Sequence, residues 1–113
     1  MLNSTAAIRE WREAHPSETL YLRGADLGGA NLRGANLRGA DLGENRVFQV
    51  GPGGSRGDYT VIKSGPNLDE VWCGCFRGTL AEFEAKVEKT HGDNEHGRYY
   101  RALIALFRAG ATP

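Results

Sequence analysis

Long apolar runs are missing from this chain. No stretch approaches the roughly twenty consecutive apolar residues that span a bilayer, so the sequence predicts no transmembrane helix. Residues 1–16 also lack the basic start and apolar centre of a secretory signal peptide. We therefore expect a cytoplasmic protein.

An excess of charge is missing too, and cysteine is scarce. The 113 residues include 14 Lys and Arg and 14 Asp and Glu, so the formal net charge is zero. A balanced chain of this kind has no basic surface for neutralising phosphates, and we expect no direct binding to nucleic acid. The two cysteines, Cys73 and Cys75, are too close in the chain for an unstrained disulfide. Reduced thiols are the simpler expectation.

The chain is instead rich in a five-residue repeat that runs from Leu22 to Leu42. A period of five fits neither the 3.6 residues per turn of a helix nor the alternation of a strand. Such a regular period is typical of a stacked coil, in which each repeat is one structural unit. Two apolar columns define the repeat: Leu22, Leu27, Leu32, Leu37 and Leu42, with Ala25, Ala30, Ala35 and Ala40 two places before the last four leucines.

This segment, residues 20–44, resembles the pentapeptide-repeat family. The resemblance implies about one coil of a right-handed quadrilateral β-helix, with the Leu and Ala columns inside. A single coil leaves an apolar end above and below, so other elements must cover it. Some members of this family resemble duplex DNA and inhibit topoisomerases. That role needs a long acidic rod, and this chain is neither long nor acidic.

The flanking segments predict an α+β protein. Residues 4–14 have the pattern of a short amphipathic helix, which we expect to cover the coil through Ile8 and Trp11. After the repeat, alternating patterns predict a three-stranded antiparallel sheet, and two helical patterns follow, the first with a capping box at Thr79 and Glu82. The predicted strands cover residues 46–50, 59–63 and 70–76, and the predicted helices end at Gly92 and cover residues 95–108.

This order predicts two parts, residues 1–45 and residues 46–113, packed as one compact unit with both later helices on one face of the sheet. In the third strand, Val71, Cys73 and Cys75 are expected on one face, with Trp72 and Phe76 on the other. So small a core is marginal, and we expect a homo-oligomer.

The second half carries another resemblance. The segments SRGDYTV, CGCFRGTLAEFEAKV and THGDNEHGRYYRALIALF lie within residues 50–108. They are similar to small proteins encoded by bacteriophages and prophages, some of which have pentapeptide repeats in front. The resemblance implies no particular activity, but it implies a phage setting, in which small accessory proteins often counter host defences.

The glycine-rich loop of residues 51–58 is the first candidate site. Its glycines free the backbone to point several N–H groups at an anion, and Arg56 can clamp a phosphate. The spacing matches no standard nucleotide motif, so a plain hairpin loop is the alternative. Trp72 would complete the site as a stacking platform if it faces away from the helices. The predicted ligand-binding residues are Gly53, Gly54, Ser55, Arg56, Asp58 and Trp72.

A second candidate is the polar cluster between the two later helices. His91, Asp93, Asn94 and His96 lie where one helix ends and the next begins, so capping explains most of them and anion binding is the alternative. Cys73 and Cys75 with the two histidines have the right count for zinc. The one-residue gap between the cysteines argues against it, and we expect no metal and no cofactor.

These patterns favour a non-enzymatic binding protein. In the leading hypothesis, it sequesters a small phosphorylated, nucleotide-like ligand and so counters host defence. The alternative is a protein–protein interaction module, or an inhibitor of a host enzyme, that docks through the repeat. A small hydrolase that uses His91 or His96 with Asp93 is a third hypothesis, and it lacks a convincing catalytic set.

Overall fold

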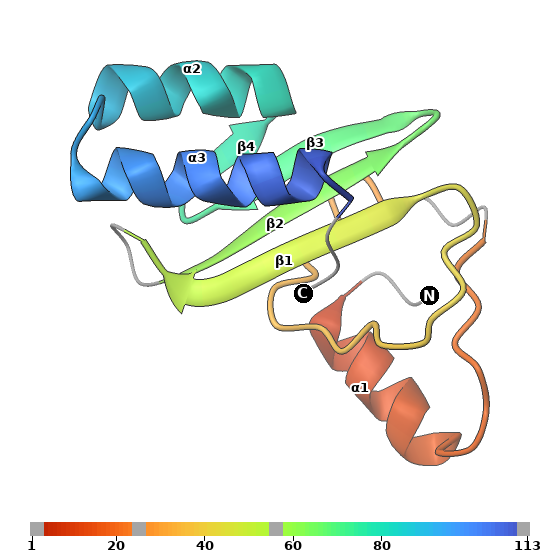
Figure 1. Ribbon diagram of the computed structural model, residues 1–113. Coiled ribbons are helices and arrows are strands. Elements are labelled where there is room, and N and C mark those ends of the chain that lie inside the picture. The colour runs from red at the N-terminus through yellow and green to blue at the C-terminus, as the bar shows by residue number, and fades with distance from the viewer. Residues whose placement is uncertain (1–3, 24–26, 55–57, 111–113) are drawn as a thin grey trace.

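The computed structural model describes residues 4–23, 27–54 and 58–110. The sheet is the central layer (Figure 1). Helices α2 and α3 cover one face, while the repeat and helix α1 lie against the other. The fold is α+β, as the sequence predicts. Among the described residues, no helix combines the length and the apolar character needed to cross a membrane.

The sheet has four antiparallel strands in the order β1-β2-β3-β4, not the three that we predicted. The predicted strand over residues 70–76 is broken at Gly74, which has a φ of +58°. Glycine adopts this left-handed conformation without steric cost, and the turn pairs Cys73 with Phe76 across a tight hairpin. The strands are β1 (Arg46–Gly53), β2 (Asp58–Gly65), β3 (Leu68–Cys73) and β4 (Phe76–Gly78).

The hairpin changes which side chains share a face. Val71 and Cys73 point toward the helices and Trp72 points away, as predicted. Phe76, however, packs on the helix side, and Cys75 is exposed in the turn. The prediction was wrong for these two residues because strict alternation ends where the backbone turns at Gly74.

Each of the three helices begins at a polar cap residue. In α1 (Thr5–Ala14), the Ser4 hydroxyl accepts from the Ala7 N–H at 3.1 Å. In α2 (Leu80–Thr90), the capping box of Thr79 and Glu82 is complete. In α3 (Glu95–Arg108), the Asn94 side chain accepts from Gly97 N–H. Each cap satisfies backbone donors that the first helical turn leaves unpaired.

Two separate apolar cores lie on the two faces of the sheet. The core under the helices is built from the sheet and both later helices: Phe48, Ile62, Val71, Cys73, Phe83, Val87, Tyr100, Leu103, Ile104 and Phe107. The core of the repeat includes one residue of α1 as well: Ile8, Leu20, Leu22, Leu27, Ala30, Leu32 and Ala35.

The repeat stacks on itself and is covered from both directions. Tyr21 forms a parallel bridge with Asp41, twenty residues away, which is the length of four pentapeptides. Helix α1 covers the repeat through buried Ile8, and Thr5 donates from its backbone N–H to Asn31 O at 3.0 Å. Since the sheet lies on the other side, the chain itself covers the repeat. A second copy of the chain is therefore not needed to cover the repeat, and the homo-oligomer stays a prediction.

Lys63 joins the sheet to the repeat. It lies on β2 and is only 1% exposed. Its ammonium group donates to Leu27 O and Ala30 O, both at 2.7 Å, and to the Glu70 carboxylate at 2.8 Å. Glu70 also accepts from the Trp72 indole and, at 3.0 Å, from the Gly29 N–H. A buried charge is tolerated only when it is paired and fully hydrogen-bonded, and this network provides both.

The same network predicts an acid-sensitive step in stability. Burial alone would raise the pKa of Glu70, but the hydrogen bonds from Lys63, Gly29 and Trp72 outweigh it and hold that pKa below its ordinary value of 4.5. A lowered folded-state pKa means that Glu70 contributes stability above pH 4.5 and loses that contribution as the pH falls through the folded-state pKa. We therefore expect the free energy of unfolding, measured with urea between pH 7 and pH 3, to fall less steeply with decreasing pH in Glu70→Gln than in the wild type.

The control for this experiment is Glu10→Gln, which removes one exposed carboxylate on α1. It should keep the wild-type dependence on pH. If the free energy of unfolding of Glu70→Gln falls with decreasing pH as steeply as that of the wild type, the role of this carboxylate is contradicted.

Candidate functional site

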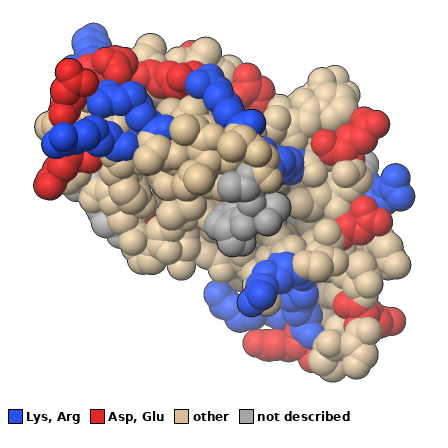
Figure 2. Space-filling model, in the orientation of Figure 1, with Lys and Arg blue, Asp and Glu red and all other residues tan. Residues whose placement is uncertain are grey.

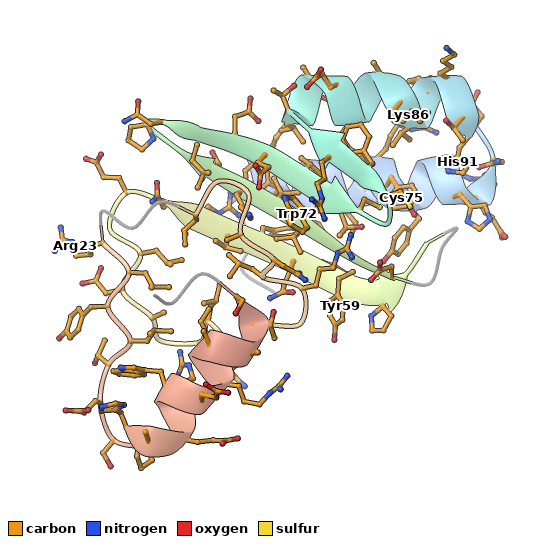
Figure 3. The ribbon with its side chains drawn as sticks, turned by 180° about the vertical axis from the view of Figure 1, so that it is seen from behind. Arg23, Tyr59, Trp72, Cys75, Lys86 and His91 are labelled. Atoms are coloured by element: carbon orange, nitrogen blue, oxygen red, sulfur yellow. The ribbon has the colours of Figure 1, made fainter. Side chains whose placement is uncertain are left out.

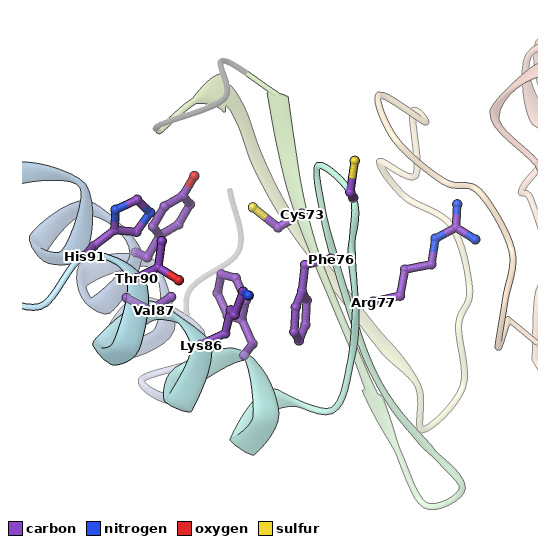
Figure 4. A pocket seen from close by; sticks show the side chains of 10 residues that line it. Cys73, Phe76, Arg77, Lys86, Val87, Thr90 and His91 are labelled. Atoms are coloured by element: carbon purple, nitrogen blue, oxygen red, sulfur yellow. The ribbon is translucent and has the colours of Figure 1, made fainter.

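A cavity of about 650 Å³ opens between the β3–β4 hairpin and helices α2 and α3. We call it the β4–α2 cavity (Figure 4). Its apolar surface comes from Phe76, Phe83 and Val87. Its polar groups come from Cys73, Cys75, Arg77, Lys86, Thr90, His91 and Tyr100. A volume of this size with an apolar floor and polar groups around it is typical of small-molecule sites.

One face of α2 supplies much of the cavity. Phe83, Lys86, Val87 and Thr90 follow the spacing i, i+3, i+4 and i+7, which places them side by side on a helix. Figure 4 shows Lys86, Thr90 and His91 facing Cys73 and Phe76 across the opening. Phe83 and Val87 pack the helix against the sheet, and this packing orients Lys86 and Thr90 toward the cavity.

Lys86 is a cavity residue that sequence reasoning missed. It belongs to the charged run of residues 82–89 and is exposed, and it also lines the cavity. The spacing from Phe83 was the signal that could have found it, because position i+3 always joins the face of position i.

The glycine-rich loop reaches α3 beside this cavity. A side chain at Gly53 would collide with the Tyr99 hydroxyl, and one at Gly54 would collide with the Tyr100 hydroxyl. Only glycine allows the backbone this close, and Gly54 also has a φ of +75°. Because Tyr100 lines the cavity, the loop and the cavity are neighbours. Ser55 and Arg56, the central residues of the predicted site, lie outside the described residues.

The other two predicted ligand residues point elsewhere. Asp58 accepts from the Tyr59 N–H at 2.7 Å and lies 3.7 Å from the Arg33 guanidinium, on the side of the repeat. Trp72 is 3% exposed and lies between the sheet and the repeat (Figure 3). Its ring is covered by the Arg77 guanidinium at 3.6 Å and approached by the Lys63 ammonium at 4.9 Å. Its ring therefore offers no open face for a base.

The polar cluster between the helices divides into two groups. Asn94 caps α3, and exposed Asp93 pairs with Arg101 at 3.3 Å, so both have structural roles. His91 lines the cavity and stacks on Tyr100 with ring centroids 5.8 Å apart. His96 is 5.4 Å from His91. The cluster thus contributes the His91 imidazole to the cavity, and the His96 imidazole lies next to it.

The cysteines do not form a pair. Cys73 is buried, lines the cavity and accepts from the Thr60 hydroxyl at 3.4 Å, whereas Cys75 is exposed in the hairpin turn. Across the part of the chain that the structure describes, no three His, Cys, Asp or Glu side chains gather in a way that could hold a metal ion.

The charges around the cavity have one sign. Lys86 brings a positive charge to its rim, and no carboxylate belongs to its described lining. Arg77 contributes its stem, since its guanidinium turns away from α2 to cover Trp72 (Figure 4). The cavity therefore suits a ligand with an apolar or aromatic body and an anionic group near Lys86.

Comparisons with known proteins reach only the repeat. Residues 21–44 match the family model described as pentapeptide repeats (8 copies), which supports the resemblance for this segment. No curated protein matches the chain, and no solved structure matches it.

Proposed function

We propose that this chain is a binding protein that holds a small anionic ligand in the β4–α2 cavity. The observation that supports it is the combination of an apolar floor at Phe76 and Phe83 with a rim that carries Lys86 and no carboxylate among the described residues. A nucleotide-like, phosphorylated compound has this chemistry, with a flat ring for the floor and phosphate for the lysine.

The binding itself is the proposed function. A protein that retains the ligand without converting it would act by sequestration in the host cytosol. In the phage setting that the second resemblance implies, removing such a ligand would counter host defence. The repeat, as one coil of right-handed quadrilateral β-helix, would serve as the platform on which the sheet rests. A homo-oligomer is part of this proposal.

The direct test is a binding panel with matched variants. Cyclic nucleotides and ADP-ribose-type compounds should include at least one that binds, measured by calorimetry or thermal shift. Lys86→Ala should weaken that binding about tenfold, since hydrogen bonds to a charged group contribute about 1.5–3 kcal/mol. Lys89→Ala, which removes an exposed lysine from the last turn of the same helix, is the control and should bind like the wild type.

Two results would count against the proposal. The first is an absence of binding across the panel. The second is equal binding by the wild type and Lys86→Ala, which would move the ligand away from the cavity.

The alternative is a module that docks a partner protein through the repeat. Helix α1 and the sheet cover the repeat, so a partner would have to approach its sides. Tyr21, which is 69% exposed on the repeat, is the residue that favours this alternative. A partner recovered from host lysate by the wild type and lost in Tyr21→Ala would support it over ligand binding.

A further inference from the structure

A second, smaller groove lies between α1 and the repeat, apart from the β4–α2 cavity. Its volume is about 230 Å³. Helix α1 supplies Thr5, Arg9 and Arg12, and the repeat supplies Asn36. These residues are far apart in the chain and meet only because α1 covers the repeat.

One lining residue of the groove carries an unsatisfied donor. The Nε atom of Arg12 is buried and has no hydrogen-bond partner among the described residues. The other end of the same guanidinium is fixed, since Nη2 donates to Arg38 O at 2.9 Å. A buried donor without a partner is costly, and a bound ion or water is the usual explanation.

Other donors surround it. Asn36 accepts from the Arg38 N–H through its side-chain oxygen at 3.2 Å, which assigns its amide nitrogen as the donor end. Thr5 uses its hydroxyl proton on Arg33 O at 2.7 Å. Two guanidinium groups and one amide thus border a groove whose lining also includes the Glu13 carboxylate.

The described lining of the groove has an excess of positive charge, with two arginines against one carboxylate. Within the described ranges, neither Arg9 nor Arg12 has an ion-pair partner, whereas Arg23, Arg33 and Arg108 each have one and Arg101 has two. Glu13 is exposed, lines the groove and forms an ion pair with neither arginine. Figure 2 shows basic side chains gathered on the surface beside the start of α1.

We propose that this groove binds a phosphoryl group, held by Arg9, Arg12 and Asn36. Guanidinium groups match the oxygens of phosphate in two-point contacts, and the side chains of Arg9 and Arg12 both line the groove. The groove is below the roughly 300–1,000 Å³ of sites for whole drug-sized ligands, so the ligand is free phosphate or the terminal group of a phosphomonoester. The proposal does not depend on the function proposed for the β4–α2 cavity.

The test is a titration of the intact chain with inorganic phosphate and, separately, with glycerol phosphate, at constant ionic strength. Amide resonances of α1 and residues 31–38 should shift with a saturable dependence on concentration. Saturation with both compounds indicates a site for any phosphoryl group, and saturation with inorganic phosphate alone indicates free phosphate. No saturable shift with either compound overturns the proposal.

Matched variants locate the site. Arg12→Gln and Arg9→Gln should each weaken phosphate binding about tenfold. Arg98→Gln on α3 removes the same charge from an exposed position and should bind like the wild type. Arg9 is exposed, so its variant tests the groove even if Arg12→Gln unfolds the helix. Equal affinities in Arg9→Gln and Arg98→Gln would overturn the proposal.

Discussion

Replacing Lys63 with methionine should lower the free energy of unfolding by about 3–5 kcal/mol, the range for removing one partner of a buried ion pair. Methionine keeps most of the length of the side chain and removes the ammonium group. Leu27 O and Ala30 O would then lose their donor, and Glu70 would lose its cation. Urea unfolding followed by circular dichroism at pH 7 measures the change.

Two further variants make this result specific. Lys89→Met, at an exposed position of α2, should stay within about 0.5 kcal/mol of the wild type. The double variant Lys63→Met/Glu70→Leu should recover part of the loss, because an apolar pair leaves no unpaired buried charge. If Lys63→Met is as stable as Lys89→Met, the sheet and the repeat are not joined by this lysine.

Truncating Trp72 to alanine should have an effect of similar size, about 3–5 kcal/mol, as expected for a buried tryptophan. The ring is 3% exposed and fills the space between the sheet and the repeat, beside Lys63 and under Arg77. Its indole N–H also donates to Glu70, so the substitution removes packing and a hydrogen bond together. Thermal and urea unfolding of the purified variant would measure the loss.

This experiment also separates the structural role of Trp72 from the predicted role as a stacking platform. Trp72→Phe keeps an aromatic ring, should lose less stability than Trp72→Ala, and should leave the affinity for a cavity ligand unchanged. The opposite result, normal stability with lost ligand binding in Trp72→Ala, would place the ligand on the tryptophan and away from the β4–α2 cavity.

Local signals in the sequence were sufficient for the elements that depend on neighbouring residues. Thr79 with Glu82 starts α2 as predicted, and Asn94 starts α3 from within the polar cluster where a cap was expected, because a cap is a contact within one turn of chain. The need to cover a single coil also led to the prediction that the first helix packs on the repeat, and Ile8 is buried there. The caps follow from the residue types at neighbouring positions, and the covering helix follows from the period of the side chains.

The candidate site was predicted only in part. The glycines of the loop and His91 were selected, and the structure brings both to the neighbourhood of the cavity through Tyr100. Lys86 was missed, because a charged residue in a charged run looks solvated until its spacing from Phe83 is counted. Trp72 was assigned to the correct face of the sheet, but its burial depends on the repeat lying over that face.

The five-residue period by itself determined that the chain contains a stacked repeat, and the caps and apolar stripes determined where the helices lie. The tertiary structure alone decided which polar residues are buried and which face a cavity. Nothing near Lys63 in sequence distinguishes it from a surface lysine; its partners Leu27 and Ala30 lie more than thirty residues away. Burial of a charge is set by contacts between distant segments, and the period of a repeat records only contacts within it.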